Sequence, residues 1–156
     1  MTDIQTITSF LYQEADCLDR ADLDSWFELY TDDAIYWMPV SAQQTDPHSH
    51  ISLFYDDRVM MEIRRRNFGH DLAASMEYPV RCSHIIGNVR VDNETDKELT
   101  VRSNFQALVY YKEQQTLYAG TYKHELAKID DLLKIKHKRV DLINADAEHG
   151  SLVIYL

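Results

Sequence analysis

The sequence predicts an α+β fold in which a cone-shaped, curved antiparallel sheet carries N-terminal helices on its concave face. Two observations lead to this fold class: apolar residues follow helical spacing early in the chain, and four consecutive strand-like segments follow Pro79. Consecutive strands indicate an antiparallel meander, and helices that precede such a sheet pack on one of its faces. With 156 residues and 45% apolar content, the chain is expected to form a single domain, 1–156.

Three helices are expected from the spacing of apolar residues. The first runs from Thr2 to about Arg20 and buries one face, and a second, short helix begins near Asp22. A third helix is predicted from Ile51 to about Asn67. The consecutive arginines 64–66 fall near the end of this third helix, where the helix dipole favours cations. They are therefore interpreted as helix-end charges.

Strand-like segments and turn-forming residues make up the rest of the chain. A short strand is expected from Ala34 to Met38, and the polar stretch from Val40 to His50 is interpreted as a surface loop. Four longer strands are expected at Val80 to Val91, Glu98 to Tyr111, Leu117 to Ala127 and Leu132 to Ile143. The segment from Ser151 to Leu156 is too apolar for a free tail, so we expect it to be held as a strand or against a partner.

Composition and charge argue against several classes of function. The 16 basic residues face 26 acidic ones, and the net charge of −10 disfavours binding to nucleic acid or to an anionic membrane surface. No apolar run is long enough to span a membrane, and the first residues lack the order of a secretory signal, so a cytoplasmic protein is expected. With 4 glycines and no glycine-rich phosphate loop, a nucleotide cofactor is not expected.

The two cysteines, Cys17 and Cys82, are far apart and have no His or Cys at zinc spacing. We therefore expect two buried, reduced thiols rather than a disulfide or a structural zinc site. The segment Cys82-Ser83-His84 could supply half of a Rieske ligand set, which needs two cysteines and two histidines. The other half is missing from the sequence, so no cluster is expected in this chain.

A polar loop carries another arrangement that could bind a cation. His48 and His50 are two positions apart, and Asp46 is close to both in sequence. Two histidines and a carboxylate can hold a mononuclear iron. A catalytic metal needs ligands on rigid elements with supporting contacts, so a solvated loop is the favoured interpretation.

A third arrangement would perform general acid–base chemistry. A cone fold could gather Tyr36, Asp33 and His84 in a dry pocket with a strand residue such as Asn104 or His124, where burial shifts pKa values. Small dehydratases and isomerases with cone folds work in this way. Plain packing is the favoured interpretation, because a strand-rich chain with 10 tyrosines and 7 histidines offers such sets by chance.

Several segments, taken in order, resemble a known family. They are Tyr55-Asp56-Asp57-Arg58, the run from Tyr78 to Val91 that contains Pro79, Arg81 and His84, the N-terminal Tyr36-Trp37-Met38-Pro39, and the C-terminal Lys138 to Leu142. In order and spacing they resemble the small β subunits of Rieske-type, aromatic-ring-hydroxylating dioxygenases over nearly the full chain. Tyr-Trp-Met-Pro is most similar to the benzoate and anthranilate branch, whereas Cys82 stands where many relatives carry another residue.

The resemblance implies a cystatin-like or nuclear-transport-factor-like cone and a place in an oxidoreductase complex for the catabolism of aromatic compounds. Large α subunits would hold the Rieske [2Fe–2S] cluster and a mononuclear non-haem iron, and NADH would supply electrons through a reductase. The small subunit would be structural and non-catalytic. It would form a β trimer within an α3β3 hexamer.

The residue-level expectations follow from this family and from the cost of burying charge. Asp56, Arg58, Arg81 and His84 are predicted to form buried polar or ion-pair contacts that anchor the central helix to the first long strand. No catalytic, cofactor-binding or metal-binding residue is expected in this chain. The alternative hypothesis is a free-standing cone-fold dehydratase or isomerase that uses Tyr36, Asp33 and His84.

Overall fold

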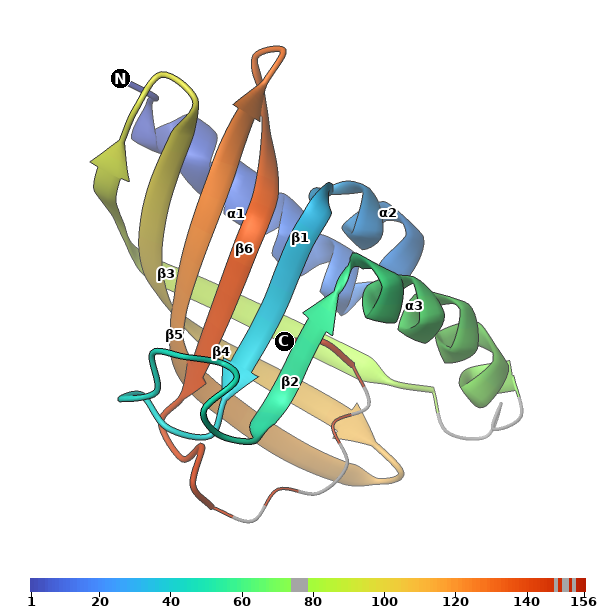
Figure 1. Ribbon diagram of the computed structural model, residues 1–156. Coiled ribbons are helices and arrows are strands. Elements are labelled where there is room, and N and C mark those ends of the chain that lie inside the picture. Colours follow the sequence, from blue (N-terminus) through green and yellow to red (C-terminus); the bar gives the residue numbers. More distant parts are fainter. Residues whose placement is uncertain (74–78, 148, 150–151, 153) are drawn as a thin grey trace.

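The computed structural model describes residues 1–73, 79–147, 149, 152 and 154–156. These residues form three helices and six strands, which are joined by turns and loops (Figure 1). In chain order they are α1 (Ile4–Asp19), α2 (Leu23–Glu28), β1 (Tyr30–Pro39), β2 (Ser52–Asp57), α3 (Arg58–Ala73), β3 (Arg81–Glu94), β4 (Glu98–Tyr111), β5 (Gln114–Ile129) and β6 (Leu132–Leu142). Among the described residues, no helix is long and apolar enough to cross a membrane.

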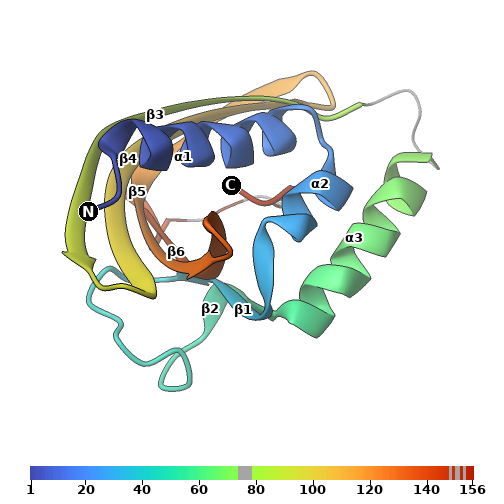
Figure 2. The same cartoon turned by 90° about the horizontal axis from the view of Figure 1, so that it is seen from above.

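The strands form one curved sheet in the order β2-β1-β6-β5-β4-β3. Strands β3 to β6 make the expected antiparallel meander, and β2 pairs antiparallel with β1. The pair between β1 and β6 is parallel, so the sheet is mixed rather than wholly antiparallel. Helix α1 lies on the concave side of this sheet (Figure 2), with Ile7, Leu11 and Leu18 completely buried or nearly so. The predicted α+β cone is confirmed.

The helix predicted from Ile51 is wrong in its first part. Residues Ser52–Asp57 form β2, and α3 begins only at Arg58. The physical reason is a period of two within the segment: Phe54 and Asp56 are buried while Tyr55 and Asp57 are exposed, and pairing with β1 satisfies the backbone. The Asp57 carboxylate then accepts a hydrogen bond from the Met60 amide and so caps the helix.

Helix α3 ends later than predicted, so the interpretation of arginines 64–66 as helix-end charges is wrong. They lie within the helix, which continues to Ala73, and not at its end. Arg64 contacts Asp56 on β2, and Arg65 contacts Asp24 on α2. These side chains therefore hold α3 against its neighbours.

The C-terminal end of the chain lies inside the cone, as Figures 1 and 2 show from two directions, whereas positions 151 and 153 of the predicted segment lie outside the described residues. Ile154, Tyr155 and Leu156 are at most 4% exposed and belong to the core of their own chain. None of the three is in a strand. The expectation of a strand or a partner contact for this segment is therefore wrong for these residues, because the curved sheet leaves interior space that apolar side chains fill.

One glycine is required by the close approach of β5 and β6. A Cβ atom on Gly120 would lie 1.9 Å from the backbone oxygen of Asp141, which cannot move without breaking the strand pair. We expect Gly120→Ala to lower the free energy of unfolding by at least about 1–3 kcal/mol, as overpacking does. Gly87→Ala is the matched control, because a Cβ there meets no atom within 4 Å. Urea denaturation would show the difference, and equal losses in both variants would contradict the steric explanation.

Candidate functional site

The interior of the cone contains a cluster of buried polar side chains around Glu14. One carboxylate oxygen, Oε2, accepts hydrogen bonds from Trp26 Nε1 at 3.1 Å, Tyr30 Oη at 2.8 Å and Lys138 Nζ at 3.0 Å. The other, Oε1, lies 2.8 Å from His124 Nε2. Glu14, His124 and Lys138 are each at most 1% exposed. The charges are therefore paired out of contact with water.

Each member of this cluster is placed by the periodicity of its element. Glu14 lies on the apolar face of α1, between Leu11 and Leu18. His124 and Lys138 point inward from β5 and β6, on the faces that bury their apolar neighbours. The sequence analysis did not single out Glu14 and Lys138 as site residues. The signal was present, because each is a charged residue at a position that the apolar periodicity of α1 or β6 assigns to the core. Such residues persist in a core only when they are paired.

The cluster has a definite charge state at neutral pH. Burial works to raise the pKa of Glu14, but the Lys138 ammonium and His124 outweigh it and hold that pKa well below its usual range. Burial lowers the pKa of His124, and Glu14 opposes this only in part. Glu14 is thus ionised and His124 is neutral, with its Nε2 proton donated to Glu14. The Nδ1 atom of His124 has no hydrogen-bond partner among the described residues.

These shifts predict that acid destabilises the fold. Glu14 has a folded-state pKa below its usual 4.5, so its stabilising contribution is present above that pH and is lost as the pH falls below it. The pKa of His124 is lower in the folded chain than its usual value of 6.5. Below pH 6.5 the unfolded chain therefore binds more protons at this residue than the folded chain does, which favours unfolding. We expect the free energy of unfolding to decline from about pH 6.5 downward in urea titrations. His124→Gln should flatten the decline between pH 7 and 5, and an unchanged slope would contradict this assignment.

The C-terminal residues fill the interior next to this cluster. The Tyr155 ring stacks on Trp26 with centroids 4.4 Å apart and meets Tyr36 edge-on at 4.7 Å. The Leu156 backbone oxygen accepts hydrogen bonds from Lys138 Nζ at 2.8 Å and from Tyr36 Oη at 3.0 Å. The space in which a cone-fold enzyme would bind substrate therefore holds the protein's own side chains.

The predicted acid–base residues do not come together. Tyr36 is buried and bound to Leu156, whereas Asp33 is exposed and accepts a hydrogen bond from Thr31. His84 lies on β3, and three strands separate β3 from the strand that carries Tyr36 and Asp33. At about 4.8 Å per strand, the separation along the sheet is about 19 Å. Because Asp33 is exposed to solvent and His84 is paired with Asp19, the three side chains do not form one acid–base group, and the alternative hypothesis is not favoured.

Two of the four predicted polar residues hold the region around α3. Asp56 is 2% exposed and binds Arg64 Nε at 2.5 Å and Tyr155 Oη at 2.7 Å. The Arg58 guanidinium lies 3.4 Å from the Phe27 ring centroid and donates to the carbonyl oxygens of Phe27 and Tyr30. Arg58 thus caps the C-terminal end of α2.

The other two predicted residues do not anchor the central helix. Arg81 is exposed, with its guanidinium 5.6 Å from the Tyr110 ring centroid. His84 Nδ1 lies 2.6 Å from the Asp19 carboxylate, so it ties β3 to α1 and not to α3. The predicted link between α3 and β3 is therefore wrong for both residues. Sequence order placed them next to the helix, but the curvature of the sheet carries β3 to α1.

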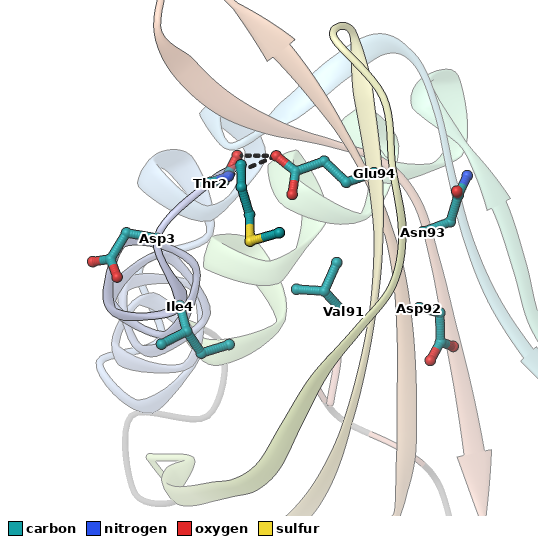
Figure 3. Close-up of a pocket in the computed structure, with 8 residues that line it drawn as sticks. Thr2, Asp3, Ile4, Val91, Asp92, Asn93 and Glu94 are labelled. Atoms are coloured by element: carbon teal, nitrogen blue, oxygen red, sulfur yellow. Dashed lines mark hydrogen bonds between the residues drawn. The ribbon is translucent and has the colours of Figure 1, made fainter.

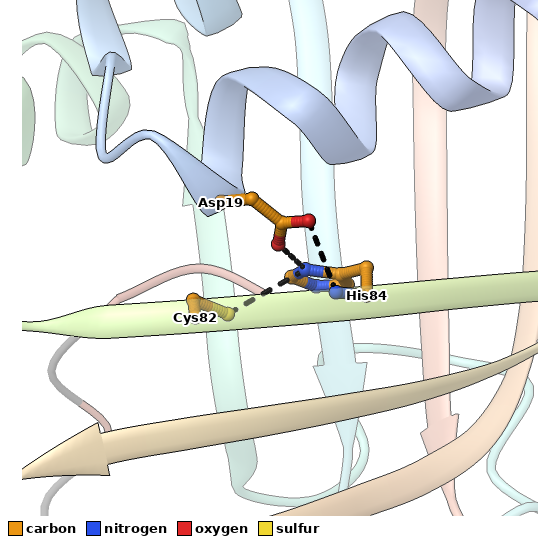
Figure 4. A group of neighbouring side chains, drawn as sticks. All are labelled: Asp19, Cys82 and His84. Carbon is orange, nitrogen blue, oxygen red and sulfur yellow. Dashed lines mark hydrogen bonds and ion pairs between the residues drawn. The ribbon is translucent and has the colours of Figure 1, made fainter.

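The surroundings of Cys82 do not fit a Rieske cluster. The thiol lies 3.5 Å from His84 Nδ1, and the third donor nearby is the Asp19 carboxylate (Figure 4). A Rieske cluster needs two thiolates and two imidazoles. Cys17 is buried in the core and is not part of this group. Burial and Asp19 raise the pKa of the half-buried Cys82 to about 12, so at neutral pH it is a thiol and a weak nucleophile.

A hollow of about 730 Å³ lies where the start of the chain meets the end of β3 (Figure 3). One of the three carboxylates that line it, Glu94, accepts hydrogen bonds from the Thr2 amide and hydroxyl at 2.7 Å and from Lys128 at 2.6 Å. These donors lower the pKa of Glu94 to about 2. The Glu94 carboxylate thus fixes the position of Thr2 near the N-terminus, and with its lowered pKa it is a poor general base.

The histidines of the loop between β1 and β2 do not gather a metal site. The Asp46 carboxylate accepts a hydrogen bond from the backbone amide of His48. Asp46, His48 and His50 are all exposed. Within the described part of the chain, the one group of three donor atoms close enough for a cation is Asp19, Cys82 and His84.

Known proteins share this fold and sequence pattern. Residues 13–147 match the family model for the ring hydroxylating beta subunit. The chain belongs to the family of ring-hydroxylating β subunits. The benzoate 1,2-dioxygenase subunit beta of Acinetobacter baylyi is 32% identical over 90% of this chain and 86% of its own. The crystal structure of the benzoate 1,2-dioxygenase beta subunit from Burkholderia mallei has a TM-score of 0.81 and 31% identity over 92% of this chain and 93% of that one.

A solved structure of low sequence identity shares this fold. A putative scytalone dehydratase from Novosphingobium aromaticivorans superposes with a TM-score of 0.69 at 18% identity, over 89% of this chain and 83% of that one. At that identity the likeness shows the fold alone. The predicted resemblance to dioxygenase β subunits, including the benzoate branch, is confirmed, and the members found are subunits of ring-hydroxylating dioxygenases.

Proposed function

We propose that this chain is the non-catalytic, structural small subunit of the terminal oxygenase component of an aromatic-ring-hydroxylating dioxygenase. The observation that carries the proposal is the filled interior. Tyr155 and Leu156 occupy the concave side of the sheet, and both carboxylate oxygens of Glu14 beneath them are used in contacts with Trp26, Tyr30, His124 and Lys138. A residue whose hydrogen bonds are all used within the core is a structural residue, because activating a substrate would leave a buried charge unpaired.

The same proposal assigns the chemistry to a large α subunit. That partner would hold the Rieske [2Fe–2S] cluster and the mononuclear non-haem iron, and would receive electrons from NADH through a reductase. The complex would add both atoms of dioxygen to an aromatic ring, as a step in aromatic catabolism in the cytoplasm. The two named relatives are β subunits of benzoate 1,2-dioxygenases, which supports an aromatic acid as the substrate class.

The proposed role of the single domain 1–156 is to hold α subunits in register, as a β trimer within an α3β3 hexamer. Exposed apolar side chains support association with other chains. Val59 and Ile63 are four positions apart on α3, on one helical face, and are 66% and 44% exposed. Apolar groups on an exposed helix face are typical of protein–protein contacts.

Co-expression with a ring-hydroxylating α subunit tests this function. We expect a mixed complex in which all iron and all oxygenase activity require the α subunit, while this chain alone is iron-free and inactive toward benzoate. Removing the small subunit should lower the mass of the assembly and its activity together. A purified small subunit that converts an aromatic substrate by itself would overturn the proposal.

Two variants separate a structural role from a catalytic one. His124→Gln and Tyr36→Phe change buried groups of the interior without changing the outer surface. If the interior is structural, complexes assembled with either variant at low temperature should keep the kcat and KM of the parent complex. A loss of kcat in an intact complex would indicate that the interior takes part in the reaction.

A further inference from the structure

Three side chains with metal-binding atoms meet between α1 and β3. Cys82 and His84 are two positions apart on β3, so they project from the same face of the strand, toward the end of α1. Asp19, the last residue of α1, lies above them with its carboxylate directed at His84 (Figure 4). The donor atoms Oδ, Sγ and Nδ1 all lie within 4.8 Å of one another. Asp19 is 65 positions from His84, so only the fold brings them together.

The distances between these donors are close to those around tetrahedral zinc. Zn–S bonds of about 2.3 Å and Zn–N bonds of about 2.05 Å place sulfur and nitrogen about 3.6 Å apart at a tetrahedral angle. Cys82 Sγ and His84 Nδ1 are already 3.5 Å apart. A Zn–O bond of about 2.0 Å requires nitrogen and oxygen to be about 3.3 Å apart. The Asp19 oxygen, now 2.6 Å from Nδ1, must therefore retreat by a fraction of an ångström.

The surroundings permit that movement and leave a route from solvent. The Asp19 side chain is 27% exposed at the end of its helix, so it can rotate without disturbing the core. A hollow of about 330 Å³ adjoins the group and is lined by Tyr12, Asp16, Asp19, His84 and Ile86, among others. A water molecule entering from this hollow would complete four ligands around a cation.

We propose that Asp19, Cys82 and His84 form a binding site for a thiophilic divalent cation, Zn²⁺, that joins α1 to β3. Thiolate and imidazole select zinc over calcium or magnesium, and one carboxylate balances part of the charge. His84 Nε2, which would carry the proton when Nδ1 binds metal, has no hydrogen-bond acceptor among the described residues. Sites that lack this supporting contact bind metal about 10–100-fold more weakly, and Zn²⁺ must also displace the proton of the Cys82 thiol, so we expect weaker binding than at a fully supported zinc site and an affinity that rises with pH.

Titration of the metal-free full chain with Co²⁺ provides the test. Co²⁺ replaces Zn²⁺ in such sites, and a Co²⁺–thiolate bond gives a near-ultraviolet charge-transfer band. We expect that band to saturate at one Co²⁺ per chain, to be abolished by excess Zn²⁺ and to be absent in Cys82→Ser. Zn²⁺ should also raise the Tm of the parent chain, and EDTA should reverse the shift.

Two further variants distinguish this site from adventitious binding. Asp19→Asn keeps a hydrogen-bond acceptor for His84 and should weaken Co²⁺ binding at least tenfold while preserving the fold. Cys17→Ser is the matched control, because Cys17 is the other free thiol and lies outside the group, so its spectrum should equal that of the parent. Absence of a charge-transfer band, or a band that persists in Cys82→Ser or vanishes in Cys17→Ser, would overturn the proposal.

Discussion

Lys138→Met is expected to lower the free energy of unfolding by about 3–5 kcal/mol, which is the usual cost of leaving a buried charge without its partner. The substitution keeps the approximate volume of the side chain but removes the ammonium that pairs with Glu14 at 3.0 Å and binds the Leu156 oxygen at 2.8 Å. Glu14 would remain ionised or would have to take up a proton. Urea denaturation at neutral pH, followed by tryptophan fluorescence, would measure the loss.

A neighbouring lysine supplies the control for this prediction. Lys136 lies two positions earlier on β6 and forms an exposed pair with Glu98. Lys136→Met should leave the unfolding midpoint nearly unchanged, because solvent screens such pairs. The double variant Glu14→Gln with Lys138→Met removes both charges and should recover part of the loss. Equal effects at positions 136 and 138 would show that the buried pair does not stabilise the fold.

Tyr155→Ala is expected to cost about 3–5 kcal/mol, because it opens a cavity where a buried ring had packed. The ring contacts Trp26, Tyr36 and Phe54, and its hydroxyl donates to Asp56 at 2.7 Å. Tyr155→Phe keeps the ring, and Asp56 keeps its contact with Arg64. We therefore expect this variant to lower the free energy of unfolding by only about 1–2 kcal/mol. Denaturation curves of the two variants would separate packing from hydrogen bonding.

A small phenol provides an independent check on the same cavity. Para-cresol matches the side chain that Tyr155→Ala removes, so it should raise the Tm of that variant and leave the parent chain unchanged. Toluene, which lacks the hydroxyl, should raise the Tm less. Tyr12→Ala serves as the control substitution, because Tyr12 is 54% exposed on α1. Equal responses to para-cresol in both variants would contradict a specific cavity.

The local order of the chain could be predicted from its sequence. Periodicity placed α1, α2 and the four strands β3 to β6 close to their observed bounds, because each pattern reflects which face of one element is buried. The segment Ile51 to Asp57 was mistaken for helix because its apolar residues also suit a strand, and only pairing with β1 decides between them. The ordered motifs around Tyr36, Asp56 and His84 were sufficient to indicate the family.

The contacts between distant segments were decided only by the tertiary structure. Sequence spacing could not show that Glu14, His124 and Lys138 meet, that Tyr155 fills the cone, or that Asp19 reaches Cys82 and His84. Each of these contacts joins residues from different elements, and the curvature of the sheet determines which elements meet. The sequence by itself determined the family and the elements other than β2, because both are recorded in local patterns. The paired interior and the proposed metal site depend on distances that exist only after the sheet has folded around α1.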